Sequence, residues 1–120
     1  MYIKELLNYD EEAQEADIVI SDGQFDLLCY AHPFISGDYK DLKAPLSAFM
    51  SENIMRTSEN EYRIERLQDN YYAHRFHGKI IDLQKRLVTI GNIIIKLENT
   101  IPKDINEGEF IEFSAMRIDL

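Results

Sequence analysis

Apolar and polar residues alternate over residues 16–31, ADIVISDGQFDLLCYA, on both sides of an Asp22-Gly23 pair. Alternation with a period of two is the pattern of a half-buried strand, and Asp-Gly is a preferred pair for a two-residue type I′ turn. The pattern therefore predicts a hairpin in which Ser21 pairs with Gln24. One face of this hairpin would collect six mostly apolar side chains: Ala16, Ile18, Ile20, Phe25, Leu27 and Cys29.

Residues 71–98 hold β-branched runs on both sides of a polar break at residues 83–86. This arrangement predicts a second hairpin, with the break as its turn. Gly78 and Gly91 fall inside the two predicted strands, where a glycine often marks a bulge or a tight bend. Such bends allow strands to curl around the core of a small barrel.

The C-terminal segment GEFIEFSAMRIDL, residues 108–120, predicts another strand. Its apolar alternation runs from Ile111 to Ala115 and then resumes out of phase at Met116. A phase change of this kind indicates a bulge, or a strand that passes between two sheets. The preceding residues 100–108 predict a connection with one helical turn.

The remaining segments carry weaker patterns. Residues 2–9 fit a strand or a short helix, and residues 61–67 fit a short strand. Residues 33–44 predict a loop. In residues 45–57, PLSAFMSENIMRT, apolar side chains recur at helical spacing after Pro45, although a bent strand fits the same pattern.

The sum is six to eight short strands with at most one or two short helices. It predicts an all-β fold, either a small, partly open OB-like β-barrel or a two-sheet sandwich. No linker or repeat divides the chain, so residues 1–120 are expected to form a single domain. Exposed edge strands of such a barrel would allow two copies to pair into a homodimer.

The composition and the use of cysteine indicate the compartment in which the protein folds. Apolar residues make up 45% of the chain and charged residues 29%, which fits a globular protein. Cys29, the only cysteine, lies in an apolar run, which indicates a buried residue and no internal disulfide. Neither a signal peptide nor an apolar run of membrane-spanning length is apparent. We therefore expect a cytoplasmic protein.

The net charge of −9 is uneven along the chain. Residues 1–60 hold 4 Lys/Arg and 12 Asp/Glu, a net charge of −8. The densest acidic run is DEEAQEAD, residues 10–17, which reads either as a solvated loop or as a docking surface for a basic partner. The candidate docking residues are Asp10, Glu11, Glu12 and Glu15. The leading functional interpretation is a non-catalytic protein-interaction module, such as a neutraliser of a basic toxin.

A second candidate lies in YYAHRFHGK, residues 71–79. On a continuous strand, parity turns His74 and Phe76 towards the core. The outward face would carry a basic ridge made of Tyr71, Arg75, His77 and Lys79. Such a ridge would bind single-stranded nucleic acid or another anion, although its charges could instead pair with acids on neighbouring strands. A bulge at Gly78 would move Lys79 off the ridge.

The two histidines of this segment do not predict a metal site. His74 and His77 are three residues apart, so a strand points them to opposite faces. No metal, cofactor or catalytic motif is apparent, and the chain is more simply read as a non-enzyme. A small enzyme or ligand carrier, with a pocket formed only by the fold, is the third interpretation.

Overall fold

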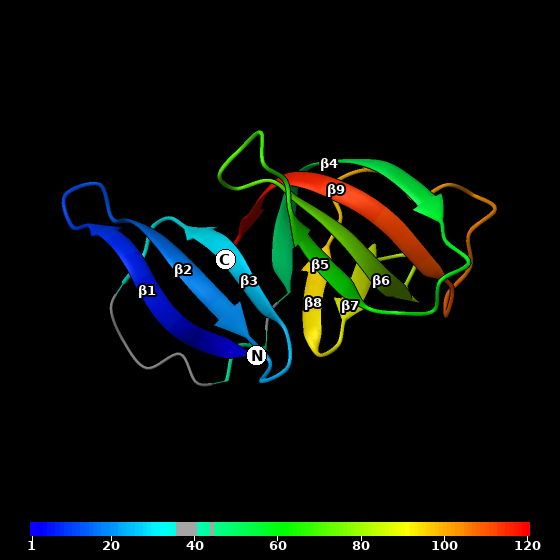
Figure 1. The fold of residues 1–120 in the computed structure, drawn as a ribbon, viewed down its shortest axis with the longest axis horizontal. Coiled ribbons are helices and arrows are strands. Elements are labelled where there is room, and N and C mark those ends of the chain that lie inside the picture. The colour runs from blue at the N-terminus through cyan, green and yellow to red at the C-terminus, as the bar shows by residue number, and fades with distance from the viewer. Residues whose placement is uncertain (36–40, 44) are drawn as a thin grey trace.

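The computed structural model describes residues 1–35, 41–43 and 45–120 and folds them into nine strands (Figure 1). These residues contain no helix, and none that could cross a membrane, so the all-β prediction is confirmed. The strands are β1 (Tyr2–Asp10), β2 (Glu15–Ser21), β3 (Asp26–Ala31), β4 (Leu46–Arg56), β5 (Arg63–Arg66), β6 (His74–Asp82), β7 (Leu87–Ile90), β8 (Ile93–Lys96) and β9 (Phe110–Asp119).

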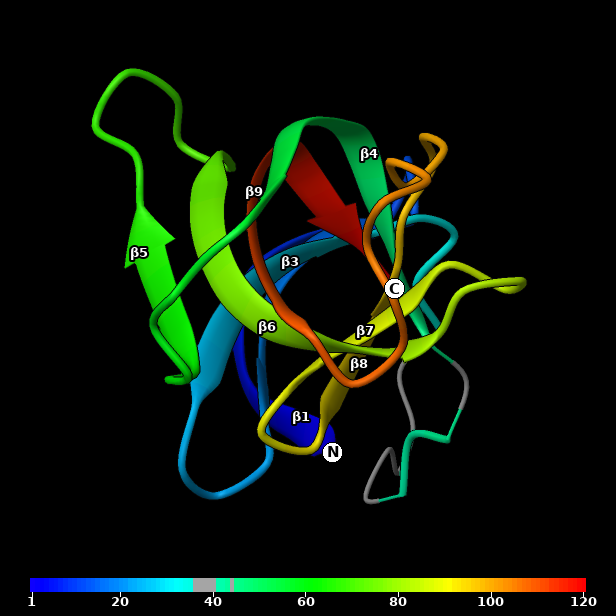
Figure 2. The same cartoon turned by 90° about the vertical axis from the view of Figure 1, so that its right-hand side faces the viewer.

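Five of the strands form a β-barrel, as Figure 2 shows. Around the ring the order is β4, β8, β7, β6 and β9, and β9 then pairs with β4. All neighbours are antiparallel except β4 and β8. The predicted small barrel is therefore confirmed, and the pairing of β9 with both β4 and β6 closes the ring that we expected to be partly open.

The ring is built around a three-stranded meander of β6, β7 and β8. Two further strands close it. β9 pairs with β6, the first strand of the meander, and β4 runs parallel to β8, the last strand of the meander.

Four strands lie outside the ring. β5 pairs with the outer edge of β6, and β1, β2 and β3 form an antiparallel sheet beside the barrel, at the left of Figure 1. Among the described residues, backbone bonding joins this three-stranded sheet to the ring through one bridge pair, Tyr30 with Asp119, and a hydrogen bond of 2.9 Å from Leu120 N to Tyr30 O. β1 and β5 are the two free edges.

A continuous cluster of buried side chains connects the barrel with the three-stranded sheet. The sheet contributes the face predicted from alternation, except that Phe25 is only partly buried. The largest fully buried side chains are Phe76, Phe113, Ile18, Ile20, Leu27, Leu46, Ile80, Ile90, Ile93, Ile95, Leu97 and Ile111. Folding of the ring and packing of the sheet against it therefore share one core.

The hairpin of β2 and β3 keeps the predicted face but not the predicted register. Ser21 pairs with Asp26 instead of Gln24, so the turn is a four-residue loop and not a two-residue turn. The Asp22 carboxylate accepts hydrogen bonds from the backbone N–H groups of Gln24, at 2.9 Å, and Phe25, at 2.7 Å. These bonds stabilise the wider loop. A shift of two residues preserves strand parity, which is why the buried face was still correct.

The second predicted hairpin is a three-stranded meander, because Gly91 does not lie inside a strand. Gly91, with φ at 60°, and Asn92 form a tight turn between the paired residues Ile90 and Ile93. The polar break at residues 83–86 is the turn between β6 and β7, as predicted.

Gly78 lies inside β6, as predicted, where the barrel leaves no room for a side chain. A Cβ on Gly78 would lie 2.6 Å from the Val88 side chain and 2.8 Å from the Thr89 carbonyl oxygen. Pairing with β9 runs through Gly78 without a shift, and the irregularity of β6 falls later, between Ile80 and Asp82. No bulge is therefore present at Gly78.

The segment with helical spacing is a bent strand. Met50 and Asn53 of β4 have φ values of 52° and 56°, so the chain turns twice and its outward side chains change phase. The phase change predicted for β9 is also present, since Ala115 and Ile118 are buried whereas Met116 is 36% exposed.

Two predicted connections are outside the strands. Residues 100–108 form the predicted connection, but it contains turns, one with a hydrogen bond of 3.1 Å from Ile105 N to Pro102 O, in place of the helical turn that we expected. In the loop predicted at 33–44, residues 36–40 and 44 are outside the described residues, and the others form no strand.

Candidate functional site: an acidic hollow lined by tyrosines

The acidic run forms the hairpin that joins β1 to β2. The Asp10 carboxylate accepts hydrogen bonds from the N–H groups of Glu12, at 3.1 Å, and Ala13, at 3.2 Å, and so fixes the turn. All four predicted docking residues, Asp10, Glu11, Glu12 and Glu15, are exposed. Their carboxylates are therefore concentrated at one tip of the three-stranded sheet, the far left of Figure 1.

One row of side chains crosses the sheet beside this tip. Register places Asn8 opposite Asp17, and Asp17 opposite Tyr30. Asn8 Nδ2 donates a hydrogen bond of 3.2 Å to Asp17 Oδ2. Tyr72, from the turn before β6, donates from its hydroxyl to Asp17 Oδ1 at 2.6 Å. Asp17 thus joins the sheet to the segment YYAHRFHGK, although 55 residues separate the two partners.

These groups surround a hollow of about 250 Å³. It is lined by Asn8, Tyr9, Asp10, Glu15, Asp17, Tyr30 and Tyr72. Three of the lining residues are carboxylic acids, three are tyrosines, and none is a cation. The Tyr30 and Tyr72 rings meet edge to face, with 6.0 Å between their centroids.

Two of the tyrosines, Tyr30 and Tyr72, have raised pKa values in this setting. Burial, followed by the hydrogen bond to Asp17, raises the pKa of Tyr72 well above its ordinary value. Burial, followed by a hydrogen bond to Glu15, also raises the pKa of Tyr30. The hollow therefore combines negative carboxylates with neutral aromatic rings.

The protein already holds one cation on this aromatic cluster. The Arg117 guanidinium lies over the Tyr30 ring at 4.4 Å and is held by Asp119 through bonds of 2.6 and 3.1 Å. This pairing of a carboxylate with an aromatic face is an established way to hold a guanidinium. The same two kinds of group line the hollow next to it.

Of the predicted basic ridge, Tyr71 lies at the rim of this cluster. It is 47% exposed and packs edge to face against Tyr72, with 4.9 Å between ring centroids. Arg66 lies 5.1 Å above the Tyr71 ring and donates to the Tyr71 carbonyl oxygen at 2.8 Å. Tyr71 therefore belongs with the tyrosines and not with the strand residues that follow it.

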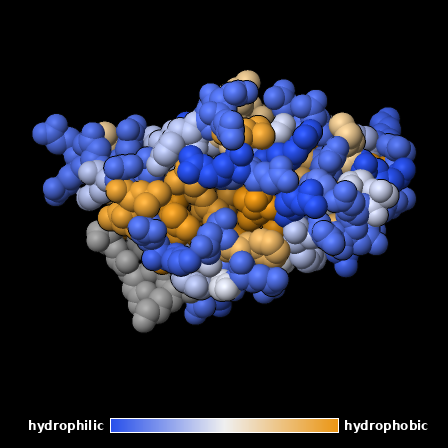
Figure 3. Space-filling view, viewed as in Figure 1, coloured by the Kyte–Doolittle hydropathy of each residue, from blue (hydrophilic) through white to orange (hydrophobic). Residues whose placement is uncertain are grey.

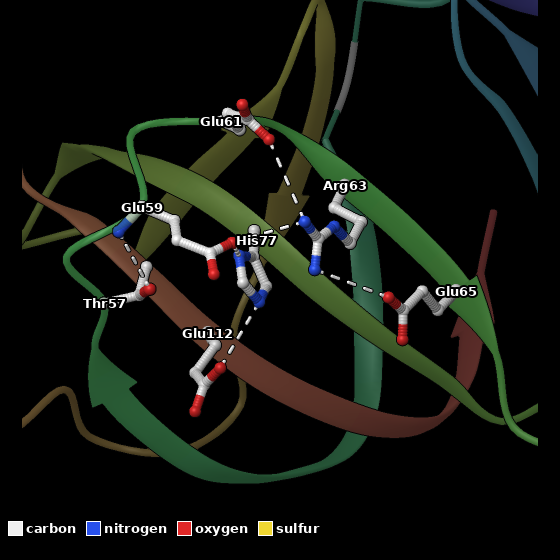
Figure 4. A network of polar contacts seen from close by, with 7 residues as sticks. All are labelled: Thr57, Glu59, Glu61, Arg63, Glu65, His77 and Glu112. Atoms are coloured by element: carbon white, nitrogen blue, oxygen red, sulfur yellow. Dashed lines mark hydrogen bonds and ion pairs between the residues drawn. The ribbon is translucent and has the colours of Figure 1, made fainter.

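His77 was expected to face solvent, and that expectation is wrong: it is only 6% exposed. Figure 4 shows its ring between two carboxylates, with Nε2 3.3 Å from Glu112 and Nδ1 3.8 Å from Glu59. Parity correctly turned His77 away from the inside of the barrel. However, Glu59, in the connection before β5, and Glu112 of β9 lie against the His77 ring on that outer face, and parity does not reveal such contacts.

The ridge is consequently interrupted. Arg75 is exposed, Lys79 is half-buried, and neither forms an ion pair with any residue that the structure describes. Between them lies the buried His77. In the register of the neighbouring strands, Glu65 lies opposite Arg75 and Glu112 lies opposite His77. Their alternation of charge gives a weaker anion surface than the sequence suggested.

His74, His77 and Cys29 are buried and have structural surroundings. His74 is buried, and its Nδ1 donates to the Tyr72 carbonyl oxygen at 2.9 Å. The two ring nitrogens of His77 face different carboxylates, Nδ1 towards Glu59 and Nε2 towards Glu112. A metal ion bound to one nitrogen would therefore not reach both carboxylates. Over residues 1–35, 41–43 and 45–120, no group of three His, Cys, Asp or Glu could hold a metal. Burial raises the pKa of the Cys29 thiol, as suits a core residue.

No family model matches the chain, and neither a curated protein nor a solved structure matches it. The assignment of the hollow as the candidate site therefore rests on its geometry alone. Sequence reasoning found its acids Asp10 and Glu15 but missed Asp17, Tyr30 and Tyr72. The true hairpin register would have shown that Asp17 faces Tyr30, whereas no local signal brings Tyr72 to them.

Proposed function

We propose that the protein is a non-catalytic interaction module that binds a basic protein partner through the acidic hollow. The observation that carries this proposal is the grouping of three carboxylates and three tyrosines, without a cation, around one hollow. An arginine or lysine side chain of the partner would enter it, with its charge facing Asp10, Glu15 and Asp17 and its stem against the rings of Tyr30 and Tyr72.

The charge of the whole protein supports a basic partner. Residues 1–60 carry −8 of the net charge of −9, and the hollow lies in this part except for Tyr72. A one-sided negative field speeds the approach of a cationic surface and opposes the approach of nucleic acid. Neutralisation of a basic protein, such as a toxin, is the form of this function that we favour. A reducing, cytoplasmic setting fits the single buried cysteine.

The other two interpretations have less support. A nucleic-acid surface on Arg75, His77 and Lys79 loses its central residue to burial between Glu59 and Glu112. A ligand carrier would need space in the barrel, whose interior is packed with large side chains such as Phe76 and Phe113.

The test is binding of a fluorescent arginine-rich peptide, followed by anisotropy. The Glu15→Gln/Asp17→Asn variant should bind at least about 10-fold more weakly, because two charges next to the bound cation are removed. The matched control is Glu11→Gln/Glu12→Gln, which removes the same charge from the same hairpin outside the hollow. It should lose less than about 3-fold, the loss expected of screened surface charges. Equal losses in both variants, or no binding by the unmodified protein, would refute the proposal.

A further inference from the structure

Three basic side chains meet at one end of the barrel. Lys85 lies in the turn between β6 and β7, Arg86 directly precedes β7, and Lys96 ends β8. Register pairs Lys96 with Leu87, next to the two other cations. Together they line a hollow of about 380 Å³, which they share with Pro45, Gln84 and Leu87. None of these residues lines the acidic hollow.

The backbone at this turn is held in place. The Asp82 carboxylate accepts a hydrogen bond from Lys85 N at 2.9 Å, and Arg86 has φ at 58°. Leu97 N donates to Arg86 O at 2.9 Å, which ties the turn to the end of β8. The Cα positions of the three cations are thus fixed by β-pairing and by the turn, before any ligand binds.

Two nearby carboxylates, Glu98 and Asp119, line an adjoining hollow but bond to other groups and not to these cations. Glu98 accepts from Met50 N at 3.0 Å, and Asp119 takes both of its oxygens to Arg117. Arg86 donates from Nη1 to the Glu98 backbone carbonyl at 2.6 Å, and its other side-chain N–H groups form no hydrogen bond with the residues that the structure describes. Within the described part of the chain, no ion pair involves Lys85, Arg86 or Lys96.

Among the described residues, the cations that pair with a carboxylate are Lys4, Arg56, Arg63 and Arg117. Other unpaired cations, such as Arg75 and Lys79, line none of the hollows described above, whereas Lys85, Arg86 and Lys96 all line one hollow. Three neighbouring cations repel one another, and an anion placed among them removes that repulsion. An arginine fork with two lysines is a donor set suited to a phosphate oxyanion.

We propose that this basic hollow, formed by Lys85, Arg86 and Lys96, binds the phosphate group of a small molecule. Of the residues that line it, none is aromatic, so recognition is of the phosphate and not of a stacked base. The net charge of −9 disfavours the binding of a long polyanion, because such a ligand would extend over the acidic surface. A small anion contacts only the basic hollow and avoids this repulsion. The ligand class is therefore a phosphate or diphosphate compound.

The experiment is a titration of ¹⁵N-labelled full-length protein with inorganic pyrophosphate, in which chloride keeps the ionic strength constant. We expect saturable shifts of the amides of residues 84–87 and 95–98. The Lys85→Gln/Lys96→Gln variant should weaken binding at least about 10-fold, because two charge-assisted contacts are lost. The charge-matched control Arg75→Gln/Lys79→Gln removes two cations that do not line the hollow, and it should bind within about 2-fold of the unmodified protein.

Three results would overturn the proposal: shifts that do not saturate, shifts spread over all exposed lysines, or equal weakening in both variants. A second titration with a single-stranded oligonucleotide, at the same phosphate concentration, distinguishes the sources of phosphate. We expect weaker binding of the oligonucleotide, and tighter binding would refute the assignment to small molecules. Arg86→Lys keeps the charge but loses the guanidinium fork, and it should bind with intermediate affinity.

Discussion

The barrel and the three-stranded sheet beside it differ in how their strands are bonded. Every strand of the ring has a neighbour on both sides, whereas β1 has a free edge and the sheet meets the ring at one bridge pair. The barrel buries large side chains on its inner face, while nearly every side chain of β1 is exposed. We infer that the barrel contributes more of the stability, and our proposed function assigns the binding of a basic partner to the sheet.

The free edge of β1 has features that discourage pairing with another strand. Register shifts in β1 fall between Ile3 and Glu5 and between Leu6 and Asn8, and bulges of this kind make an edge a poor template for another strand. Figure 3 shows an apolar strip on the face that carries β1 to β3. Leu7 and Val19 of this sheet line a hollow there. The homodimer suggested by free edges stays a prediction.

The largest expected effect comes from opening a cavity in the barrel. Phe113 is fully buried and stacks on Phe76 with 5.0 Å between ring centroids, so Phe113→Ala should lower the free energy of unfolding by about 3–5 kcal/mol. Leu6→Ala in β1, where the side chain is 48% exposed, should cost less than about 1 kcal/mol. Urea denaturation measures both. Similar losses would contradict the comparison.

A methyl group in the wall of the barrel should have the next largest effect. Gly78→Ala places a Cβ against the Thr89 carbonyl oxygen, which cannot move without disturbing β7, and should cost about 3 kcal/mol. Gly108→Ala is the control, because Gly108 has φ at 87° and open space around it. It should cost about 1 kcal/mol from backbone strain alone. Thermal unfolding that ranks the two variants in the opposite order would refute the close packing.

Loss of the link between sheet and ring should cost less. Besides the two amides of its own loop, Asp22 accepts a hydrogen bond of 2.8 Å from Asn92 N in the β7–β8 turn. Asp22→Ala should therefore cost about 2 kcal/mol. Asp10→Ala, which removes bonds only within one exposed turn, should cost about 1 kcal/mol or less.

This difference should depend on pH. Burial raises the pKa of Asp22, but bonds from the N–H groups of Phe25, Asn92 and Gln24 outweigh burial and lower it overall. A lowered pKa gives stability that is present above the unfolded value of about 3.9 and is lost as pH falls through the folded value. The gap between unmodified protein and Asp22→Ala, measured by urea denaturation, should therefore narrow in acid below about pH 4. A gap that is unchanged at low pH would exclude the carboxylate as its source.

A smaller effect is expected where the sheet meets Tyr72. Tyr72→Phe removes the hydroxyl that bonds Asp17 and should cost about 1 kcal/mol of stability. It leaves an aromatic ring in the hollow, so arginine-peptide affinity should change less than in Glu15→Gln/Asp17→Asn. Anisotropy measurements that show the larger loss for Tyr72→Phe would place the main contact on the hydroxyl instead of the carboxylates.

The smallest predicted effect is a pH dependence of His74, which lies at the junction of the two regions. Burial lowers the pKa of His74, although its bond to the Tyr72 carbonyl acts in the opposite direction. The neutral ring therefore stabilises the fold above the unfolded value of about 6.5, and this contribution declines as pH falls through the folded value. Unfolding free energies measured between about pH 7 and pH 5 should decline more steeply for the unmodified protein than for His74→Phe. Equal slopes would show that the ring is accessible to protons.

The hairpin of β2 and β3 shows what the sequence could predict. Alternation identified both strands and their buried face, because faces depend only on parity. The register depended on the Asp22 side chain, which stabilises a loop wider than Asp-Gly suggests. That shift of two residues places Tyr30 opposite Asp17, where the predicted register would have placed Leu28. The sequence therefore did not predict the central row of the candidate site, because the length of the β2–β3 turn was predicted incorrectly.

His77 and Tyr72 show what local patterns could not supply. His77 does lie on the outer face of the barrel wall, but its burial depends on Glu59 and Glu112, which come from other parts of the chain. Tyr72 reaches Asp17 only because the turn before β6 lies against the three-stranded sheet. Contacts of this kind depend on how distant parts of the chain pack together, which no short segment encodes.

The most direct test of the central claim is an amide shift map of ¹⁵N-labelled protein with the arginine-rich peptide. Binding at the acidic hollow predicts that the largest shifts fall in residues 8–17, Tyr30 and residues 71–72, while β7 and β8, which contribute no residue to the hollow, stay unchanged. Largest shifts in β7 and β8, or on the apolar strip without the acidic hairpin, would contradict the division between a barrel that stabilises and a sheet that binds.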